Sequence, residues 1–327
     1  KFIYSNYYFN SGEMDKNLTL DFTRVTEDAA IAAAHWVGKG DKYKADDAAV
    51  KEMRSRFNSL PISGKVVIGE GERDEAPMLY IGEKLGSGGT EMDIAVDPLE
   101  CTNSVAYGRQ NAMAVFAASP KGTMLHAPDT YMNKIAVSKE AKNQVSIEAD
   151  VDYNLSNLAK ALGKKIEDLT VMVLDRERHE KLIADIRKCG SRIMLISDGD
   201  VSGAIAPSFE DSGIDALMGI GAAPEGVLAA SALACLDGYM ETKFKFRDDA
   251  DRKRAIKMGV KPDKTYRVKD MVDVKNSVFA ATGVTDGPFL KGVRFTKKGA
   301  ITHSVVMRSK SKTIRFITAD HTFNNKG

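Results

Sequence analysis

Apolar positions in the N-terminal part of the chain first follow the period of a helix and then that of a strand. Residues 18–37 carry apolar side chains at helical spacing before Gly38 and Gly40, and residues 45–60 repeat the pattern before Pro61. Both segments are therefore predicted to be helices. Short runs rich in β-branched residues then predict strands at residues 65–68, 92–96, 111–117 and 134–137.

From about residue 155 the pattern alternates between the two periods. Strands are predicted at 171–174, 192–196 and 214–218, and helices at 177–188, from about 201, and at 225–236. This alternation is typical of βαβ units in a parallel or mixed sheet, which bind ligands beyond the carboxyl ends of their strands. Two further β-like runs, 300–307 and 313–318, flank basic residues and predict a C-terminal hairpin.

Composition narrows the class of protein. The chain has 327 residues, of which 43% are hydrophobic and 28% charged, which is typical of a soluble globular protein with a pair of subdomains. Its three cysteines have no C-x-x-C spacing, so we expect reduced thiols in a cytoplasmic protein. The most apolar stretch, 216–236, is interrupted by Pro224 and Glu225, so no membrane-spanning segment is predicted.

The charge balance argues against two classes of partner. With 47 basic and 45 acidic residues the net charge is only +2, which provides no overall field for nucleic acid or for an anionic membrane. Any anionic ligand must therefore be held by local groups.

The segment 97–102, with the sequence DPLECT, combines two carboxylates and a hydroxyl directly after the apolar run 94–96. Because Pro98 has no N–H group, we expect the strand to end at Asp97. Asp97 and Glu100 would repel each other unless a cation lies between them. Oxygen ligands without His or Cys suit Mg2+ or Mn2+, so the motif predicts a metal-assisted phosphate site.

Further acidic residues lie at the predicted ends of helices and strands. They are Asp46, Glu70, Asp198, Asp200 and Glu225. Each one alone is explained as well by helix capping or by a solvated loop. Together with the 97–102 motif they supply the four to six oxygen ligands that a two-metal site needs, and both interpretations stay open.

Several polar residues have two interpretations each. Thr102 either caps a short helix or orients a water molecule for attack on phosphorus. Arg176 and Arg178 follow a strand, where they either hold a second phosphate or begin an exposed helix. Tyr131 either packs in a turn or contacts a ligand. The small-residue loop 219–225 opens a helix and suits a phosphate, although such loops are common.

These residues resemble the class II fructose-1,6-bisphosphatases, a bacterial branch of the lithium-sensitive sugar and inositol phosphatase superfamily. The resemblance runs from about residue 18 to residue 318. The segments that carry it are 24–27 (RVTE), 40–42 (GDK), 68–72 (IGEGE), 74–79 (DEAPML), 96–100 (VDPLE), 127–129 (APD), 198–200 (DGD) and 223–226 (APEG). Many ordered matches of this kind are far more specific than the DPLE element alone.

The resemblance implies an α/β fold of the sugar-phosphatase type, a layered α-β-α-β-α sandwich of two subdomains. On this basis we expect a leader or added segment at residues 1–13 and an N-terminal metal-binding α+β subdomain at 14–154. A C-terminal α/β substrate-binding subdomain, with the terminal hairpin, is expected at 155–327. The implied assembly is a cytoplasmic homodimer or homotetramer.

The resemblance also implies a reaction and its residues. The reaction is hydrolysis of the 1-phosphate of fructose 1,6-bisphosphate in gluconeogenesis, with two or more Mn2+ or Mg2+ ions in each site. One ion would be held by Asp46 and Glu70, and another by Asp97, Glu100 and Glu225. The substrate would contact Glu100, Cys101, Thr102, Tyr131, Arg176, Glu177, Arg178, Asp198, Gly199, Asp200 and Ala222. Thr102 would orient the attacking water, helped by Glu70 or Asp46.

Three residues depart from the family pattern. Cys101 and Ala222 stand where the family has glycine, and Arg176 stands where lysine is expected. If position 101 requires a positive φ, its side chain is strained by about 1–2 kcal/mol. The alternatives to the main function are hydrolysis of sedoheptulose 1,7-bisphosphate or of an inositol phosphate, and a non-catalytic sugar-phosphate sensor. Arg176 and Arg178 favour a bisphosphate, because a monophosphate would leave them without a partner.

Overall fold

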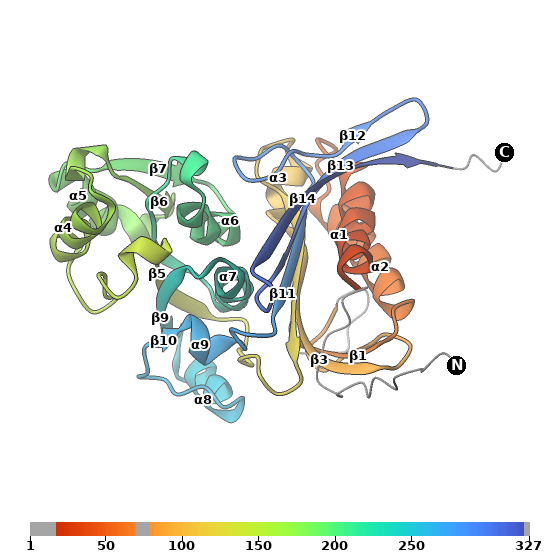
Figure 1. Cartoon of the computed structure of the whole chain (residues 1–327), viewed down its shortest axis with the longest axis horizontal. Coiled ribbons are helices and arrows are strands. Elements are labelled where there is room, and N and C mark those ends of the chain that lie inside the picture. Colours follow the sequence, from red (N-terminus) through yellow and green to blue (C-terminus); the bar gives the residue numbers. More distant parts are fainter. Residues whose placement is uncertain (1–17, 70–78, 324–327) are drawn as a thin grey trace, which may run out of the picture.

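A computed structural model describes residues 18–69 and 79–323 of the chain. Its two mixed β-sheets are separated by helices and covered by helices on both outer faces (Figure 1). The predicted α/β class and the layered α-β-α-β-α arrangement are both confirmed. Among the described residues, no helix is both long enough and apolar enough to cross a membrane.

The first sheet has the strand order β12-β13-β11-β4-β3-β1-β2, and β14 pairs with β13. These strands are β1 (Ile62–Ile68), β2 (Lys84–Leu85), β3 (Thr90–Glu100), β4 (Met113–Pro120), β11 (Val278–Gly283), β12 (Arg294–Phe295), β13 (Gly299–Arg308) and β14 (Thr313–Thr322). The helices α1 (Leu18–Ala34) and α2 (Lys42–Asn58) pack on its outer face. Phe22 and Phe57 each meet Phe116 of β4 edge to face there, which anchors both helices to the sheet.

The second sheet has the order β10-β9-β5-β8-β6-β7. Its strands are β5 (Tyr131–Val137), β6 (Thr170–Leu174), β7 (Arg192–Ile196), β8 (Ala216–Ala222), β9 (Tyr239–Lys245) and β10 (Tyr266–Arg267). The helices α4 (Val151–Leu162) and α5 (Glu180–Lys188) cover its outer face. Two short helices, α8 (Asp249–Lys257) and α9 (Val268–Met271), lie between β9 and β11 in the chain.

Helix α7 (Ala223–Leu236) forms the central layer, together with α6 (Asp200–Ile205). Its sequence is apolar on every side, and nearly all of its residues are buried. A helix without a polar face must be covered all around, and the inner faces of the two sheets provide this cover. The N-terminus of α7 follows β8 directly, so the fold carries Glu225 to the inner edge of the second sheet.

The strand that carries the DPLECT motif does not end at Asp97 as predicted. Strand β3 continues through Pro98 to Glu100, and its register against β4 shifts between Asp97 and Glu100. An extra residue at such a bulge has no ladder partner, so a proline is tolerated there even in an interior strand.

The two sheets do not divide the chain at residues 154 and 155, where the subdomain boundary is predicted. Strand β5 precedes that position but lies in the second sheet, whereas β11–β14 return to the first sheet. The predicted C-terminal hairpin is present as β13 and β14, and it extends the first sheet. The assignment of folding units to residues 14–154 and 155–327 stays a prediction.

Candidate active site

A cavity of about 560 Å³ opens where the end of β3 meets the second sheet. Of the predicted site residues, those that line it are Asp97, Glu100, Cys101, Thr102, Tyr131, Arg176, Arg178, Asp198, Gly199, Asp200, Ala222 and Glu225. Asp46 on α2 and Glu177 do not line it, although the charge of Asp46 contributes to raising the pKa of Asp97. Glu70 lies outside the described residues. The roles of all these residues stay predictions, but the fold brings most of them to one place.

Glu100 connects the end of β3 to helix α6 at the cavity wall. Its Oε1 accepts a hydrogen bond of 3.1 Å from the backbone N–H of Val201 in α6. Its Oε2 is buried and has no hydrogen-bond partner among the described residues, and the same is true of Glu225 Oε2. An unpartnered buried carboxylate oxygen is costly, so each of these two atoms needs a ligand.

The carboxylates of this wall oppose one another's ionisation. Burial raises the pKa of Glu100 well above its usual range, and the charges of Asp97 and Asp200 add to the effect. Burial, followed by the charges of Glu225 and Asp46, does the same to the pKa of Asp97. For Glu225, burial and the charge of Asp200 raise the pKa to about 7, although Lys134 opposes the shift.

A divalent cation fits this donor set. The candidate ligands are carboxylate oxygens only, and two of these oxygens have no partner among the described residues. A cation between the carboxylates would attract each of them and so offset their mutual repulsion. Among the described residues, which leave out Glu70, no three His, Cys, Asp or Glu side chains are already grouped as metal ligands. The fit therefore rests on the chemistry of the donors.

Cys101 has a left-handed backbone, with φ 69° and ψ 48°. The φ angle is therefore positive, which is the condition under which the side chain at position 101 is strained. Cys101 occupies the cap position of the short helix α3 (Thr102–Ala106), and Thr102 is the first helical residue. The interpretation of Thr102 as a side-chain cap is therefore wrong. In the described part of the chain its hydroxyl has no hydrogen-bond partner, and Thr102 lines the cavity.

Because of the strain at Cys101, we expect glycine to be more stable than alanine at this position, which is the reverse of their order inside a helix. Both Cys101→Gly and Cys101→Ala remove the buried thiol, but only Gly relieves the positive φ, so we expect Cys101→Gly to be more stable by about 1 kcal/mol. Urea unfolding of the two variants measures the difference. At Ala106, inside α3, Gly is expected to be less stable than the native Ala. An alanine variant at position 101 as stable as the glycine variant would contradict the strain.

Lys134 is a site residue that the sequence reasoning missed. Its Nζ lies 2.7 Å from Asp200 Oδ2, and the two side chains are only 1% and 5% exposed. A Cβ at Gly221 would come within 1.8 Å of the same Asp200 oxygen, so a side chain at that position would break the pair. The available signal was a lysine directly before the apolar run 135–137 of strand β5, because a buried lysine needs a carboxylate partner.

Another part of the cavity lining contains two arginines and a tyrosine, together with Asp198. Arg178 donates two hydrogen bonds to the carbonyl oxygen of Ile220, at 2.8 and 3.1 Å, and its guanidinium lies 5.1 Å from the Tyr131 ring centroid. Arg176 is 3.9 Å from Asp198 Oδ1. His179 is buried, with Nδ1 bonded to Leu174 O and Nε2 to the N–H of Ile220. The histidine thus has a structural role, while the two arginines line the cavity.

A buried carboxylate behind this wall holds the segment that carries Tyr131. Asp251 on α8 accepts hydrogen bonds from the Thr130 hydroxyl at 2.5 Å and from Arg254 at 2.8 Å. Arg247 also bonds to Asp251 and to the carbonyl of Asp129. Burial opposes ionisation of Asp251, but these hydrogen bonds and the arginine charge outweigh it and lower its pKa to about 2.

We expect Asp251→Asn to destabilise the protein by about 2 kcal/mol at pH 7. Because the folded-state pKa is lowered, the stabilisation is complete above the usual value of 3.8 and is lost as the pH falls toward about 2. Denaturant unfolding at pH 7 and at pH 2.5 measures the difference between wild type and variant, which should shrink at low pH. The exposed Asp249, in the same turn of α8, is the matched control. An equal loss in Asp249→Asn would contradict the role of Asp251.

Comparisons with known proteins identify the family of the chain. The family model of the bacterial, glpX-encoded fructose-1,6-bisphosphatases matches residues 16–321. A protein of Synechococcus sp. named D-fructose 1,6-bisphosphatase class 2/sedoheptulose 1,7-bisphosphatase is 46% identical, covering 94% of this chain and 96% of its own length. Proteins of the same name from Trichodesmium erythraeum and Synechocystis sp. are each 45% identical and cover 95% and 94% of this chain. They cover 97% of their own lengths in both cases. The chain therefore belongs to the family of bacterial fructose-1,6-bisphosphatases encoded by glpX, as its motifs indicate.

Proposed function

We propose that this protein hydrolyses the 1-phosphate of fructose 1,6-bisphosphate and releases fructose 6-phosphate and phosphate. The observation that carries the proposal is a single cavity lined both by Asp97, Glu100 and Glu225, its acidic wall, and by Arg176 and Arg178, its basic wall. The acidic wall suits cations and the basic wall suits a phosphate, so a substrate with two phosphates can span the cavity.

Mn2+ or Mg2+ would be held on the acidic wall by Asp97, Glu100 and Glu225, with Asp46 and Glu70 as the predicted ligands of a second ion. When bound, such ions offset charge on phosphoryl oxygens and make a water molecule more acidic. The buried, unpartnered oxygens of Glu100 and Glu225 support this assignment.

The other cavity residues have complementary tasks in this proposal. The Thr102 hydroxyl orients the attacking water, and Arg176 and Arg178 bind the phosphate that is not cleaved. Asp198 and Asp200 accept hydrogen bonds from sugar hydroxyls, because carboxylates are poor partners for phosphate. The buried ion pair with Lys134 fixes the position of Asp200.

Phosphate release from purified protein tests the proposal. With Mn2+ or Mg2+ present, we expect fructose 1,6-bisphosphate to yield one phosphate and fructose 6-phosphate, detected by a coupled isomerase assay. EDTA should abolish the activity, and added ion should restore it. Full activity in EDTA would refute the metal requirement, and absence of phosphate release with every ion would refute the function.

Sedoheptulose 1,7-bisphosphate is a second candidate substrate because the relatives are named for it as well as for fructose 1,6-bisphosphate. Comparing kcat/KM for the two bisphosphates in the same assay decides between them. An inositol monophosphate is expected to be a poor substrate, since it offers no second phosphate to the arginines. A non-catalytic sensor would be expected to lack metal carboxylates, yet Asp97, Glu100 and Glu225 are all present.

The proposal also includes the physiological setting implied by the family, namely gluconeogenesis in the cytoplasm by a homodimer or homotetramer. Light scattering coupled to size-exclusion chromatography measures the oligomeric state. Loss of growth on a gluconeogenic carbon source, after deletion of the gene, tests the role in metabolism.

A further inference from the structure

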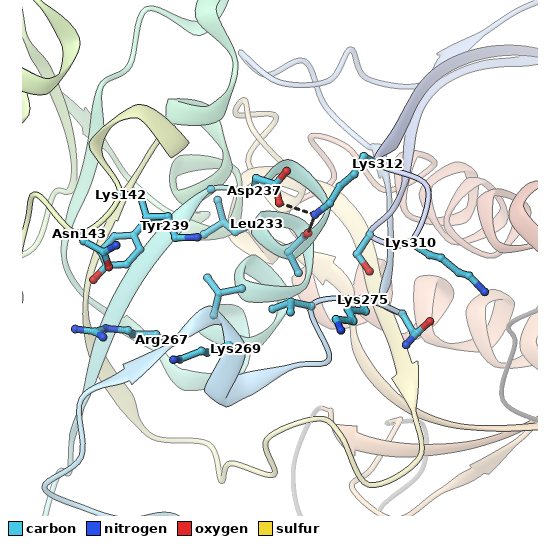
Figure 2. A pocket seen from close by; sticks show the side chains of 16 residues that line it. Lys142, Asn143, Leu233, Asp237, Tyr239, Arg267, Lys269, Lys275, Lys310 and Lys312 are labelled. Carbon is cyan, nitrogen blue, oxygen red and sulfur yellow. Dashed lines mark hydrogen bonds and ion pairs between the residues drawn. The ribbon is translucent and has the colours of Figure 1, made fainter.

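A second and larger cavity, of about 770 Å³, lies where the C-terminal end of α7 and the start of β9 meet the β13–β14 turn (Figure 2). Its volume is in the range of small-molecule sites. Helix α7 links it to the active-site cavity, since Glu225 lies in the first turn of that helix and Leu233 and Ala234 in its last turn. A helix of 14 residues is about 21 Å long, so the two cavities are separate.

The lining of this second cavity is strongly basic. Its cationic residues are Lys142, Arg267, Lys269, Lys275, Lys310 and Lys312. Of the described residues that line the cavity, Asp237 is the single carboxylate. The whole chain has nearly equal numbers of basic and acidic residues, so this excess is local. A concave surface lined by one sign of charge concentrates ions of the opposite sign.

Two of the cations are fixed by partners. Lys312 Nζ lies 2.6 Å from Asp237 Oδ1 and donates to the carbonyl of Ala234 at 2.9 Å, which offsets the negative end of α7. Arg267 lies 2.9 Å from Glu241. These interactions hold two donors in place around the cavity and leave the helix end without an uncompensated charge.

Three other cations form no close ion pair in the described part of the chain, although Lys269 interacts electrostatically with its neighbour Asp270. Within the described residues, no carboxylate lies within 4 Å of the ammonium groups of Lys142, Lys269 or Lys275. Figure 2 shows Lys142 and Lys269 on one side of the cavity and Lys275 on the other. Their positive charges repel one another across a shared space, and a multivalent anion would offset that repulsion.

The lining of the cavity also has apolar residues. Val268 and Val274 lie among the charged groups, and Val274 is 37% exposed. The Tyr239 hydroxyl donates to Glu241 Oε1 at 2.7 Å, which orients the ring at the cavity wall. A lining that combines apolar and basic residues accommodates a carbon skeleton that carries phosphates better than a free inorganic ion.

We propose that this cavity is a binding site for a small phosphorylated organic anion, separate from the catalytic site. The lysines from α9, from the loop that follows it and from the segment after β5 bind the phosphate charges, and the apolar residues of the lining contact the organic part. Because the β13–β14 turn belongs to the first sheet and the opposite wall to the second, a bound anion would bridge the two sheets.

Affinity labelling with pyridoxal 5′-phosphate tests the site directly. Its aldehyde condenses with an unprotonated lysine amine, water leaves, and borohydride supplies the hydride that reduces the C=N bond to a stable secondary amine. Peptide mapping then identifies the labelled lysines. At low reagent concentration we expect label at Lys269 and Lys275, loss of that label with inorganic pyrophosphate, and no such preference with pyridoxal, which lacks the phosphate.

Two double variants distinguish binding at this cavity from nonspecific attraction of anions to surface charge. Lys142→Met/Lys310→Met removes two cavity charges and leaves Lys269 and Lys275 as reporters. We expect the pyrophosphate concentration that halves their labelling to rise about tenfold at constant ionic strength. Lys253→Met/Lys257→Met removes two exposed charges from α8 and should leave that concentration unchanged. Labelling that merely follows exposure, or equal effects of both double variants, would overturn the proposal.

Discussion

Replacing Glu100 with Gln is expected to lower kcat for fructose 1,6-bisphosphate by at least about 10³-fold, a loss of roughly 4 kcal/mol of transition-state stabilisation. The substitution is nearly isosteric. Glutamine keeps the carbonyl oxygen that accepts from Val201 N–H, as Glu100 Oε1 does now at 3.1 Å. It replaces the unpartnered Oε2 by an amide NH2 group, which donates hydrogen bonds and does not bind a cation.

The same variant should be more stable than wild type when no metal is present. The pKa of Glu100 is raised in the folded protein, so folding takes up protons and stability falls as the pH rises above the usual value of 4.5. Glutamine removes this titration. At pH 7 in EDTA we expect the unfolding midpoint to rise by roughly 2–4 °C for each 1 kcal/mol relieved. Added Mn2+ should stabilise wild type more than the variant.

The matched control for Glu100 is Glu91, at the other end of the same strand. Its side chain is exposed and forms an ion pair of 2.5 Å with Lys121. Glu91→Gln should leave kcat within about twofold of wild type, because exposed pairs contribute little. Full activity in Glu100→Gln, or a lower unfolding midpoint of that variant in EDTA, would contradict the assignment of Glu100 to the metal-binding wall.

The local chemistry of the site was predictable from sequence because it depends on short segments. Asp97 and Glu100 lie at the end of β3, Arg176 and Arg178 follow β6, and Glu225 lies in the first turn of α7. Their positions at the ends of these elements bring them to one cavity. The prediction that Pro98 ends the strand at Asp97 is wrong for a physical reason. A proline excludes a regular ladder position, but a bulge removes the need for its N–H, and sequence patterns do not show bulges.

The arrangement of the sheets was less predictable because it depends on pairs of distant residues. The strand β11 lies between β4 and β13 in the first sheet, and the sequence analysis does not predict it. Likewise Lys134 and Asp200 are 66 residues apart, and their contact depends on the second sheet, which holds β5 and, before Asp200, β7. The strain at Cys101 was only partly predictable. The sequence indicates strain if φ is positive at this position, and the structure supplies the value of φ.

Replacing Thr102 with Val is expected to lower kcat by about 10²–10³-fold and to change KM by less than about threefold. The hydroxyl makes no hydrogen bond within the described residues, so its loss should cost little stability. Valine keeps the branched shape at the first position of α3, which separates the chemistry from packing. Its effect should therefore appear in turnover alone.

Thr102→Ser supplies the rescue that a structural role would not show. Serine restores a hydroxyl at the same first position of α3, so we expect at least a tenth of wild-type kcat, well above the valine variant. If the side chain acted only by capping or packing, valine and serine would differ in unfolding midpoint rather than in kcat, and the absence of a cap bond argues against that. Steady-state phosphate release at saturating Mn2+ measures both constants. Unchanged turnover in Thr102→Val would remove Thr102 from the mechanism and leave the orientation of the attacking water to the carboxylates alone.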